Sequence, residues 1–313
     1  MFFTICGSAG NKHAKSKGHR SDLIGVFAGK GGVGKTTCAA ASALHHASLG
    51  EETLAISTDA TPSLSHIFGV SKKEKITKVE NSLYISELGL NEVKELWDTK
   101  FGKEVYDVFS TFVSIEYEEF LDFMTSLLPG LAEEFMIDYI RELSKAGRYE
   151  TIIWDTAPLG QTLALLRTPA MLVKHLKMAP RVYSKLKRGQ EKKESVMDII
   201  KRWRDLSEES VGFLRDEVDF TVITIPEALA VEQLGGVFAE MDRFGFGVKQ
   251  LVINNVVSSR DSDFLVTKGN EQEKYIKYLH ETFAELKIVE VPMFPHEIKG
   301  MDRIKEVERV LFP

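Results

Sequence analysis

Short apolar runs recur along the chain and alternate with stretches of helical period. Continuous apolar runs of this length are typical of strands buried on both faces of a parallel sheet. Alternation of such strands with helices predicts an α/β fold with a doubly wound, mainly parallel sheet. The seven runs are Asp22–Ala28, Thr53–Thr58, Ser82–Leu88, Thr151–Asp155, Phe220–Ile225, Gln250–Asn254 and Ile288–Pro292.

Two longer stretches of helical pattern interrupt this alternation. The first, Asn91–Leu143, is rich in bulky apolar residues, and the second is Ala170–Asp216. Because no linker rich in Pro, Gly or Ser divides the chain, we expect one domain, residues 21–313. A helical subdomain would be formed by insertions 91–147 and 170–216. The second insertion carries an apolar stripe at helical spacing: Val196, Ile199, Ile200, Trp203 and Leu206.

Composition places the chain in the soluble globular class, with 43% hydrophobic and 27% charged residues. The net charge of −6 gives no reason to expect a nucleic-acid partner. Charge is nevertheless uneven: residues 91–142 hold 13 acids and 4 bases, whereas residues 171–204 hold 11 bases and 3 acids. These oppositely charged helices would face each other or solvent. Residues 1–20 are polar and basic and predict a disordered tail.

The two cysteines, Cys6 and Cys38, predict neither a disulfide framework nor a cysteine zinc site within one chain. No run approaches the roughly 18 apolar residues of a membrane span. The start, "MFFTIC", lacks the basic region and the long apolar region of a signal peptide. We therefore expect a cytoplasmic protein.

The stretch "FAGKGGVGKTT" (Phe27–Thr37) contains the phosphate-loop pattern Gly-x-x-x-x-Gly-Lys-Thr, and it lies between an expected strand and an expected helix. Glycines allow backbone N–H groups to turn toward a phosphate, and the helix start favours negative charge. Lys35 would bridge the β- and γ-phosphates, and the Thr36 hydroxyl would bind Mg²⁺. Lys30 is a second lysine that phosphate binding within one chain does not require.

Two carboxylates, Asp59 and Asp155, end apolar runs. Ligands of such sheets bind at the carboxyl ends of the strands. A carboxylate there can hold Mg²⁺ through its water shell or orient the water that attacks the γ-phosphate. An aspartate at a strand end can also be a helix N-cap, but the neighbouring phosphate loop favours the catalytic reading.

Several ordered motifs resemble those of the deviant phosphate-loop ATPases, and within them the family of arsenite-pump ATPases and tail-anchored-protein-targeting ATPases. The resemblance covers roughly residues 22–313. The motifs are "GKGGVGKTT", "STD", "DTAPLGQTL", "IPEAL", "VINN" and "PMFPHEIKG". It implies a P-loop NTPase that binds and hydrolyses ATP with Mg²⁺.

The resemblance also implies roles for individual residues. Lys30 falls on the signature lysine, which in this family reaches the nucleotide of the partner in a homodimer, so Lys30, Lys35 and Asp59 are the expected catalytic residues. Asp59 would polarise the attacking water, and Asp155 would open switch II, the segment that senses the γ-phosphate. The expected metal residues are Thr36, Asp59 and Asp155. The expected nucleotide-binding residues are Gly29, Lys30, Gly31, Gly32, Val33, Gly34, Lys35, Thr36, Thr37, Glu227, Asn254 (through the adenine) and, in a loop over the base, Pro292, Phe294, Pro295 and Glu297.

This sequence departs from the family pattern at several positions. Ala60 stands where proline is usual, and Leu159 and Gln161 replace the favoured threonine and histidine. The segment after Asn254 contains no Cys-x-x-Cys, the pair that commonly holds zinc at the dimer interface of targeting ATPases. We therefore expect no zinc and a dimer that rests on nucleotide and apolar contacts. The cysteines of the arsenite site are also missing.

The resemblance implies a homodimeric targeting factor that binds the apolar transmembrane helix of tail-anchored clients and releases it after hydrolysis. A membrane receptor would be a further partner. The first insertion has enough bulk to form a client groove, although such residues are equally typical of a plain core. Two alternatives remain: a related ATPase that is a chaperone or metallochaperone for soluble clients, and a partition-type ATPase switch. The groove residues would be Phe109, Phe112, Phe120, Phe123, Met124, Leu127, Leu128, Phe135 and Met136.

Overall fold

The computed structural model describes residues 23–57, 63–71, 74–103, 106, 110, 114–121, 131–156 and 196–313. Asp59 and its neighbour Ala60 lie outside these ranges. So do the basic stretch 171–195, Leu159 and Gln161.

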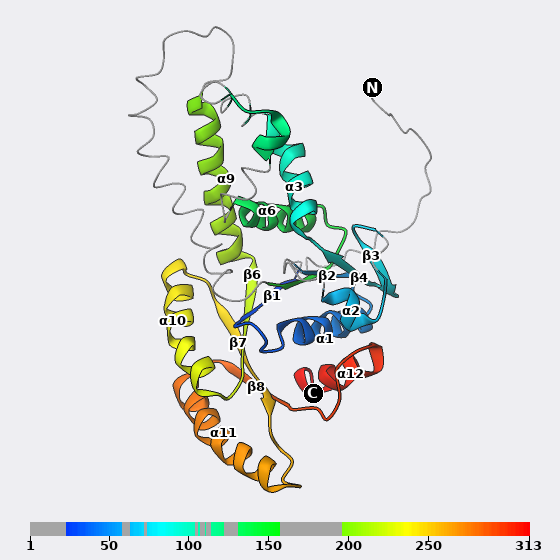
Figure 1. Ribbon diagram of the computed structural model, residues 1–313, viewed down its shortest axis with the longest axis vertical. Coiled ribbons are helices and arrows are strands. Elements are labelled where there is room, and N and C mark those ends of the chain that lie inside the picture. Colours follow the sequence, from blue (N-terminus) through cyan, green and yellow to red (C-terminus); the bar gives the residue numbers. More distant parts are fainter. Residues whose placement is uncertain are drawn as a thin grey trace, which may run out of the picture.

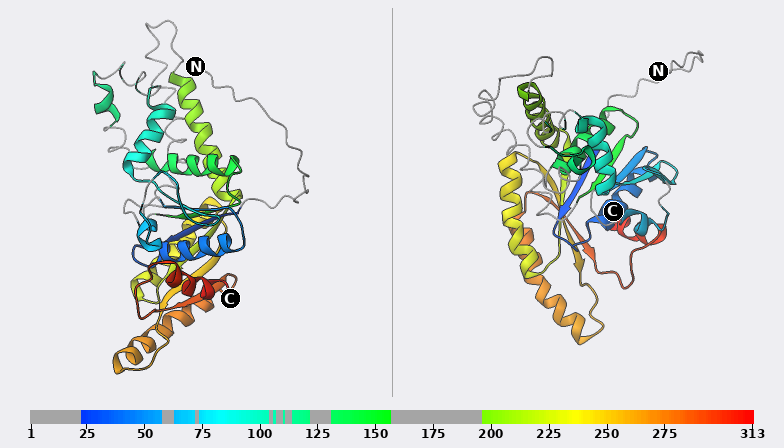
Figure 2. Two further views of the ribbon diagram at one scale, coloured as in Figure 1. Left: turned by 90° about the vertical axis from the view of Figure 1, so that its right-hand side faces the viewer. Right: turned by 45° about the horizontal axis from the view of Figure 1, so that its top comes forward.

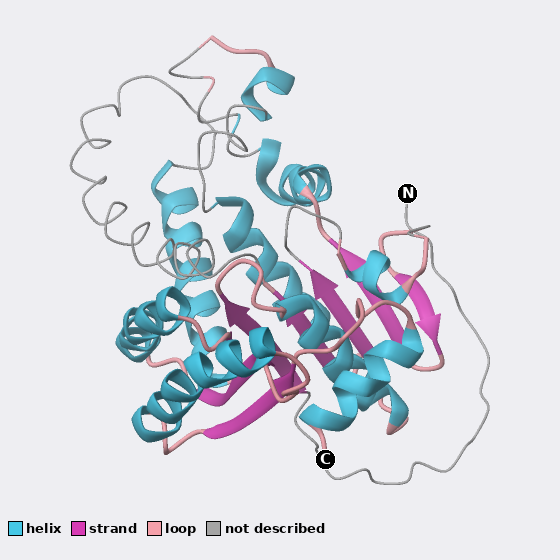
Figure 3. Ribbon diagram, turned by 60° about the horizontal axis from the view of Figure 1, so that its bottom comes forward, coloured by secondary structure: helices cyan, strands magenta, loops and turns pink. Residues whose placement is uncertain are grey.

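The described strands form one eight-stranded sheet in the order β3-β4-β2-β5-β1-β6-β7-β8 (Figures 1 and 3). All neighbouring strands are parallel except β3 and β4, which are antiparallel. The predicted doubly wound, mainly parallel α/β fold is therefore confirmed. The strands are β1 (Leu23–Gly29), β2 (Thr53–Ser57), β3 (Thr77–Glu80), β4 (Leu83–Glu87), β5 (Thr151–Asp155), β6 (Val218–Thr224), β7 (Val248–Val256) and β8 (Lys287–Pro292).

Strand β3 is the one that the apolar pattern did not predict. Its four residues alternate between half-buried and exposed positions at the edge of the sheet. Edge strands need no continuous apolar run, because one side of the ladder and much of the surface face water. The charged residues Lys78 and Glu80 are therefore compatible with an edge strand. They also interrupt any apolar run, so the apolar pattern did not predict this strand.

Helices cover both faces of the sheet (Figure 2). Alternate residues of each central strand enter one of two cores: in β1, for example, Val26 joins one core and Phe27 the other. One core packs against α1 (Lys35–Ser48), α2 (Leu64–Phe68) and α12 (Met301–Leu311). The other packs against α6 (Leu131–Lys145), α9 (Val196–Asp216), α10 (Ala228–Phe244) and α11 (Asp263–Thr282).

Helix α1 begins at the phosphate-loop lysine and lies beneath the sheet. Its alanines, with Cys38 and Leu44, are buried, and small side chains allow the helix to approach the strands closely. It ends before Gly50, whose φ of 84° lies in the left-handed region common just after a helix C-terminus.

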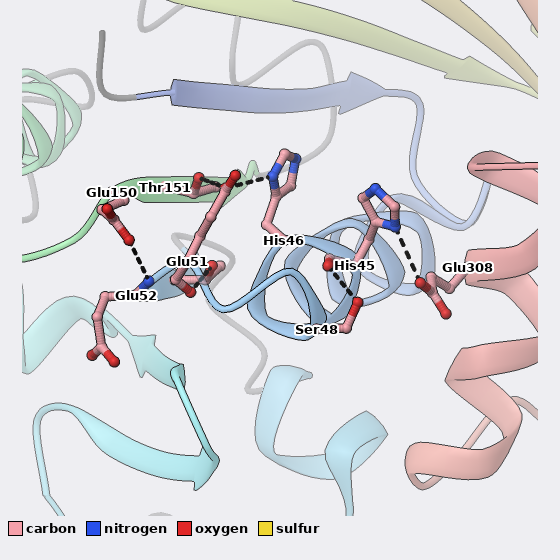
Figure 4. Close-up of polar contacts among 9 residues, drawn as sticks. His45, His46, Ser48, Glu51, Glu52, Glu150, Thr151 and Glu308 are labelled. Carbon is pink, nitrogen blue, oxygen red and sulfur yellow. Dashed lines mark hydrogen bonds and ion pairs between the residues drawn. The ribbon is translucent and has the colours of Figure 1, made fainter. Parts of the chain in front are cut away.

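The far end of α1 is fastened to neighbouring elements by polar contacts (Figure 4). His45 Nδ1 lies 3.1 Å from Glu308 Oε1 on α12, and the His45 ring stacks on Phe312 with centroids 3.9 Å apart. His46 Nδ1 lies 2.8 Å from Glu51 Oε2, which also accepts a hydrogen bond from the Thr151 hydroxyl. The last turn of α1 is thus joined to both α12 and the start of β5.

Helices α3 (Leu90–Trp97), α6 and α9, with the π-helical turn η1 (Asp98–Gly102), stand together on one side of the sheet (Figures 1 and 2). Ion pairs of the buried Arg141 side chain join two of them. Arg141 on α6 binds Asp138 on the same helix, with N and O 2.6 Å apart, and Glu209 on α9 at 2.5 Å. In the part of the chain that the structure describes, no helix is long and apolar enough to cross a membrane.

Candidate functional site

The loop between β1 and α1 requires glycine at defined positions. Gly32 and Gly34 have φ values of 78° and 97°, in the left-handed region that favours glycine. A Cβ on Gly34 would collide with the amide nitrogen of Asn254. A Cβ on Gly29 would lie 2.5 Å from the Ile223 carbonyl oxygen of β6. Neighbouring strands thus approach the loop so closely that side chains are excluded.

Lys35, the first residue of α1, is only 7% exposed. Its Nζ donates a hydrogen bond to the carbonyl oxygen of Lys30, 3.1 Å away. The ammonium group is therefore held against the backbone of the phosphate loop, where it can bind an anion. Lys30 itself is half-buried, and within the described ranges its side chain forms no ion pair.

Thr36 and Asp155 lie next to each other beneath the loop. The Thr36 hydroxyl donates to Asp155 Oδ2 over 2.8 Å, although 119 residues separate the two in sequence. The Ser57 hydroxyl donates to the same oxygen over 3.3 Å. Asp155 is 1% exposed, so these hydroxyl groups compensate part of the loss of water around its charge.

A hydroxyl and a carboxylate in contact suit a hard divalent cation, because Mg²⁺ takes oxygen ligands and commonly binds through one or two carboxylates and its own waters. The donor set at Thr36 and Asp155 thus fits Mg²⁺. Across the described ranges, no three or more His, Cys, Asp or Glu side chains gather in a group that could hold a metal ion. The expectation that zinc is absent stays a prediction.

The pKa of the Cys38 thiol reflects burial and negative charge next to the phosphate loop. Burial, together with the negative charge of Asp155, raises the pKa of Cys38 from 9.0 to about 12. The thiol is therefore protonated at neutral pH and does not act as a thiolate ligand.

The strand register brings polar residues to one edge of the sheet. Asp155 of β5 is aligned with Phe27 of β1 on one side and with Ser57 of β2 on the other. Glu87 of β4 is in turn aligned with Ser57. Glu87 is buried and accepts hydrogen bonds from the backbone N–H and the hydroxyl of Ser65, at 2.9 and 3.2 Å.

Sequence reasoning missed Ser57, Glu87 and the Ser63 hydroxyl, which lies 3.4 Å from the Thr36 hydroxyl. A signal existed for Glu87, since a carboxylate within the predicted buried strand Ser82–Leu88 must find partners when it is buried. The hydroxyl groups of Ser57 and Ser63 gave no comparable signal, because serine is common in loops and at strand ends.

The residues expected near the base have different environments. Asn254, at the end of β7, is 8% exposed and donates from Nδ2 to the Val33 carbonyl oxygen, 2.8 Å away, so it contacts the phosphate loop. Glu227 directly precedes α10 and is exposed.

The segment after β8 begins at Pro292. Phe294 packs on the core around α1 and α12, whereas Pro295 and Glu297 are exposed. Asp59 lies outside the described ranges, so its expected role stays a prediction.

Comparison with known proteins agrees with this geometry. Residues 23–313 match the family of anion-transporting ATPases. The chain is 27% identical over 293 residues to a candidate arsenical pump-driving ATPase, number 2, of Aquifex aeolicus, with 91% of this chain and 97% of the relative covered. It is 24% identical over 302 residues to ATPase GET3 of Chaetomium globosum, with 90% and 88% covered.

The match to this family spans the phosphate loop, the buried Thr36–Asp155 contact and every strand of the sheet. The chain therefore belongs to the anion-transporting ATPase family and is an ATPase.

Proposed function

We propose that the phosphate loop binds the phosphates of ATP and that Thr36 and Asp155 hold the accompanying Mg²⁺. The contact between the Thr36 hydroxyl and the buried Asp155 carboxylate carries this proposal, because it places two oxygen ligands directly below the loop. When bound, Mg²⁺ neutralises phosphate charge during transfer to water. Thr36 and Asp155 would hold the cation with their hydroxyl and carboxylate oxygens.

In this proposal the Lys35 ammonium group exchanges one hydrogen-bond acceptor for another. Its ammonium group donates to the Lys30 carbonyl oxygen in the absence of nucleotide, and the β- and γ-phosphates replace that oxygen when ATP binds. A charged acceptor makes the stronger hydrogen bond, so the exchange favours binding. Asp59, by resemblance to the family, orients and polarises the attacking water.

Lys30 acts across a homodimer interface. Its backbone carbonyl belongs to the loop, while its ammonium group has no ion-pair partner within the described ranges. This supports a role for Lys30 outside its own chain, in the nucleotide site of a second copy.

The two lysines separate these roles experimentally. Lys35→Ala should abolish both ATP binding and hydrolysis. Lys30→Ala should bind ATP with nearly unchanged affinity and lose hydrolysis by at least about a hundredfold, as for the loss of one donor to the transition state. Calorimetric titration and phosphate release measure the two quantities. Wild-type hydrolysis by Lys30→Ala would show that Lys30 has no role in catalysis.

The client of the ATPase is, in our proposal, the apolar transmembrane helix of a tail-anchored protein. Relatives named ATPase GET3 and the helices α3, α6 and α9 gathered on one face of the sheet support this choice. Arsenite is a poor alternative because it requires thiolates, and the buried Cys38 thiol has a pKa of about 12.

Capture of a client tests this part of the proposal. The protein with a non-hydrolysable ATP analogue should retain a client that carries a C-terminal apolar helix, and ADP should reduce the retained amount. The matched control is the same client without its helix. Retention that is unaffected by deleting the helix would instead support the alternative, a chaperone of soluble clients.

A further inference from the structure

The short helix α2 lies between two parts of the nucleotide site that are far apart in sequence. Its N-terminal end lies beside the phosphate loop, where the Ser63 hydroxyl is 3.4 Å from the Thr36 hydroxyl. Ser65 donates to the buried Glu87 through both its backbone N–H and its hydroxyl group. These contacts hold the start of α2 against the metal-binding threonine and the end of β4.

The second end of α2 is fixed to the segment that follows β8. The Gly300 N–H donates to the Ile67 carbonyl oxygen over 2.7 Å. Next to it, Lys299 Nζ lies 3.2 Å from His66 Nε2. An ammonium group can only donate, so the His66 nitrogen accepts, which requires it to be unprotonated.

The backbone conformation of Gly300 allows this contact. Its φ of 81° and ψ of 161° belong to a region of backbone conformation that is essentially restricted to glycine. Its N–H is therefore presented to α2 at the point where the chain turns into α12. A side chain at this position would strain the turn even though the space around it is open.

The segment 293–300 is thus held at both ends. At its start, the Met293 N–H donates to the Val256 carbonyl oxygen over 2.8 Å, where β8 leaves β7. At its end, Lys299 and Gly300 contact α2. By resemblance to the family, Pro292–Lys299 form the loop over the base. In that arrangement α2 would connect the base side of the site to the phosphate side.

We propose that His66 and Lys299 are positioning residues for the nucleotide: they hold the segment 293–300 in its base-covering position and so set affinity for the base rather than for the phosphates. This inference rests on the proposed nucleotide site. Preorganisation of a binding segment raises affinity because less conformational freedom is lost on binding. One hydrogen bond to a charged donor at the surface contributes about three- to tenfold.

The test compares ADP, which carries a base, with inorganic tripolyphosphate, which consists of phosphates alone. Dissociation constants for ADP and for inorganic tripolyphosphate are measured by calorimetry with Mg²⁺. His66→Ala and Lys299→Ala should each weaken ADP about three- to tenfold and leave tripolyphosphate unchanged. His66→Gln should bind ADP like the wild type, because its amide oxygen can accept from Lys299.

Two further variants sharpen the result. The double variant His66→Ala/Lys299→Ala should be no weaker than either single variant, since both remove the same contact. Lys287→Ala removes an exposed lysine from the opposite end of β8 and should change nothing. It controls for the loss of one positive charge.

Equal loss for ADP and tripolyphosphate would overturn the inference, because Lys299 would then act on the phosphates through its charge. Unchanged ADP affinity in both alanine variants would also overturn it, while leaving the nucleotide site itself intact. Failure of the wild type to bind either ligand would refute the proposed function as well.

Discussion

Gly34 combines a left-handed backbone with contact to Asn254, so it is the phosphate-loop position with the least freedom to change. A Cβ there meets both backbone strain and a buried amide that is itself bonded to Val33. The backbone strain and the collision are both local, and together they restrict the position of the phosphate loop relative to β7. Asn254 therefore belongs to the support of the loop in this structure.

Gly34→Ala should lower the free energy of unfolding by more than about 2 kcal/mol and abolish ATP binding, because strain and collision add. Gly236→Ala is the matched control. Gly236 lies in α10 with nothing within 4 Å of an added Cβ, so alanine should raise the unfolding free energy by about 0.5–1 kcal/mol. Urea unfolding measures both. Equal effects at the two glycines would contradict this account.

Cys38 gives a pH-dependent stability of known sign. Its pKa is about 12 in the folded protein against an ordinary 9.0, because burial and the Asp155 charge disfavour the thiolate. The protonated thiol therefore stabilises the fold fully below pH 9. This contribution is lost between pH 9 and pH 12, as the unfolded chain ionises.

Between pH 8 and pH 10 the wild type should lose about 1.4 kcal/mol more unfolding free energy than Cys38→Ala. Only the difference between the two pH slopes is compared, because other groups also titrate and alanine changes packing. Identical slopes would show that Cys38 ionises as freely in the folded chain as in the unfolded one.

At the scale of elements, the apolar pattern predicted seven of the eight described strands and the fold class. The phosphate loop was predicted from a short motif, since the mechanism of such a motif is contained in adjacent residues. The metal-binding roles of Thr36, Asp59 and Asp155 stay predictions. The contact of Ser57 with Asp155 could not be predicted, because the two residues meet only when β2 and β5 align. Edge strand β3 was missed because half of it faces solvent.

The joint between α6 and α9 provides a test of packing between elements. Asp138→Ala should cost about 3 kcal/mol of unfolding free energy, because the Asp138 side chain is 2% exposed and its loss leaves Arg141 poorly compensated. Glu209→Ala removes the other partner of Arg141, but that side chain is 61% exposed, so the cost should stay within about 1 kcal/mol. Thermal or urea unfolding distinguishes them, and a reversed order would refute this ranking.

At the scale of the whole molecule, the proposed homodimer makes each nucleotide site depend on two chains. A two-fold symmetric pair contains two identical sites, each with Lys35 from one chain and Lys30 from the other. Specific activity of the wild type should therefore rise with protein concentration.

Mixing two inactive variants tests this shared site. Lys30→Ala and Lys35→Ala, combined in equal amounts, should recover about a quarter of the wild-type rate, because half of the dimers are mixed and each has one complete site. Either variant alone should remain inactive. No recovery from a mixture that demonstrably forms mixed dimers would refute action in trans.

Gly300 also has a consequence for chirality. Its φ of 81° and ψ of 161° are difficult for any L-amino acid, but they are close to the mirror image of an ordinary extended conformation. A D-alanine at this position should therefore fit where L-alanine does not. A synthetic peptide that carries the D-residue, joined by ligation to the preceding chain, could introduce it. The D-residue would restrict the unfolded chain without straining the folded one, so the contact with α2 should become more stable than with glycine.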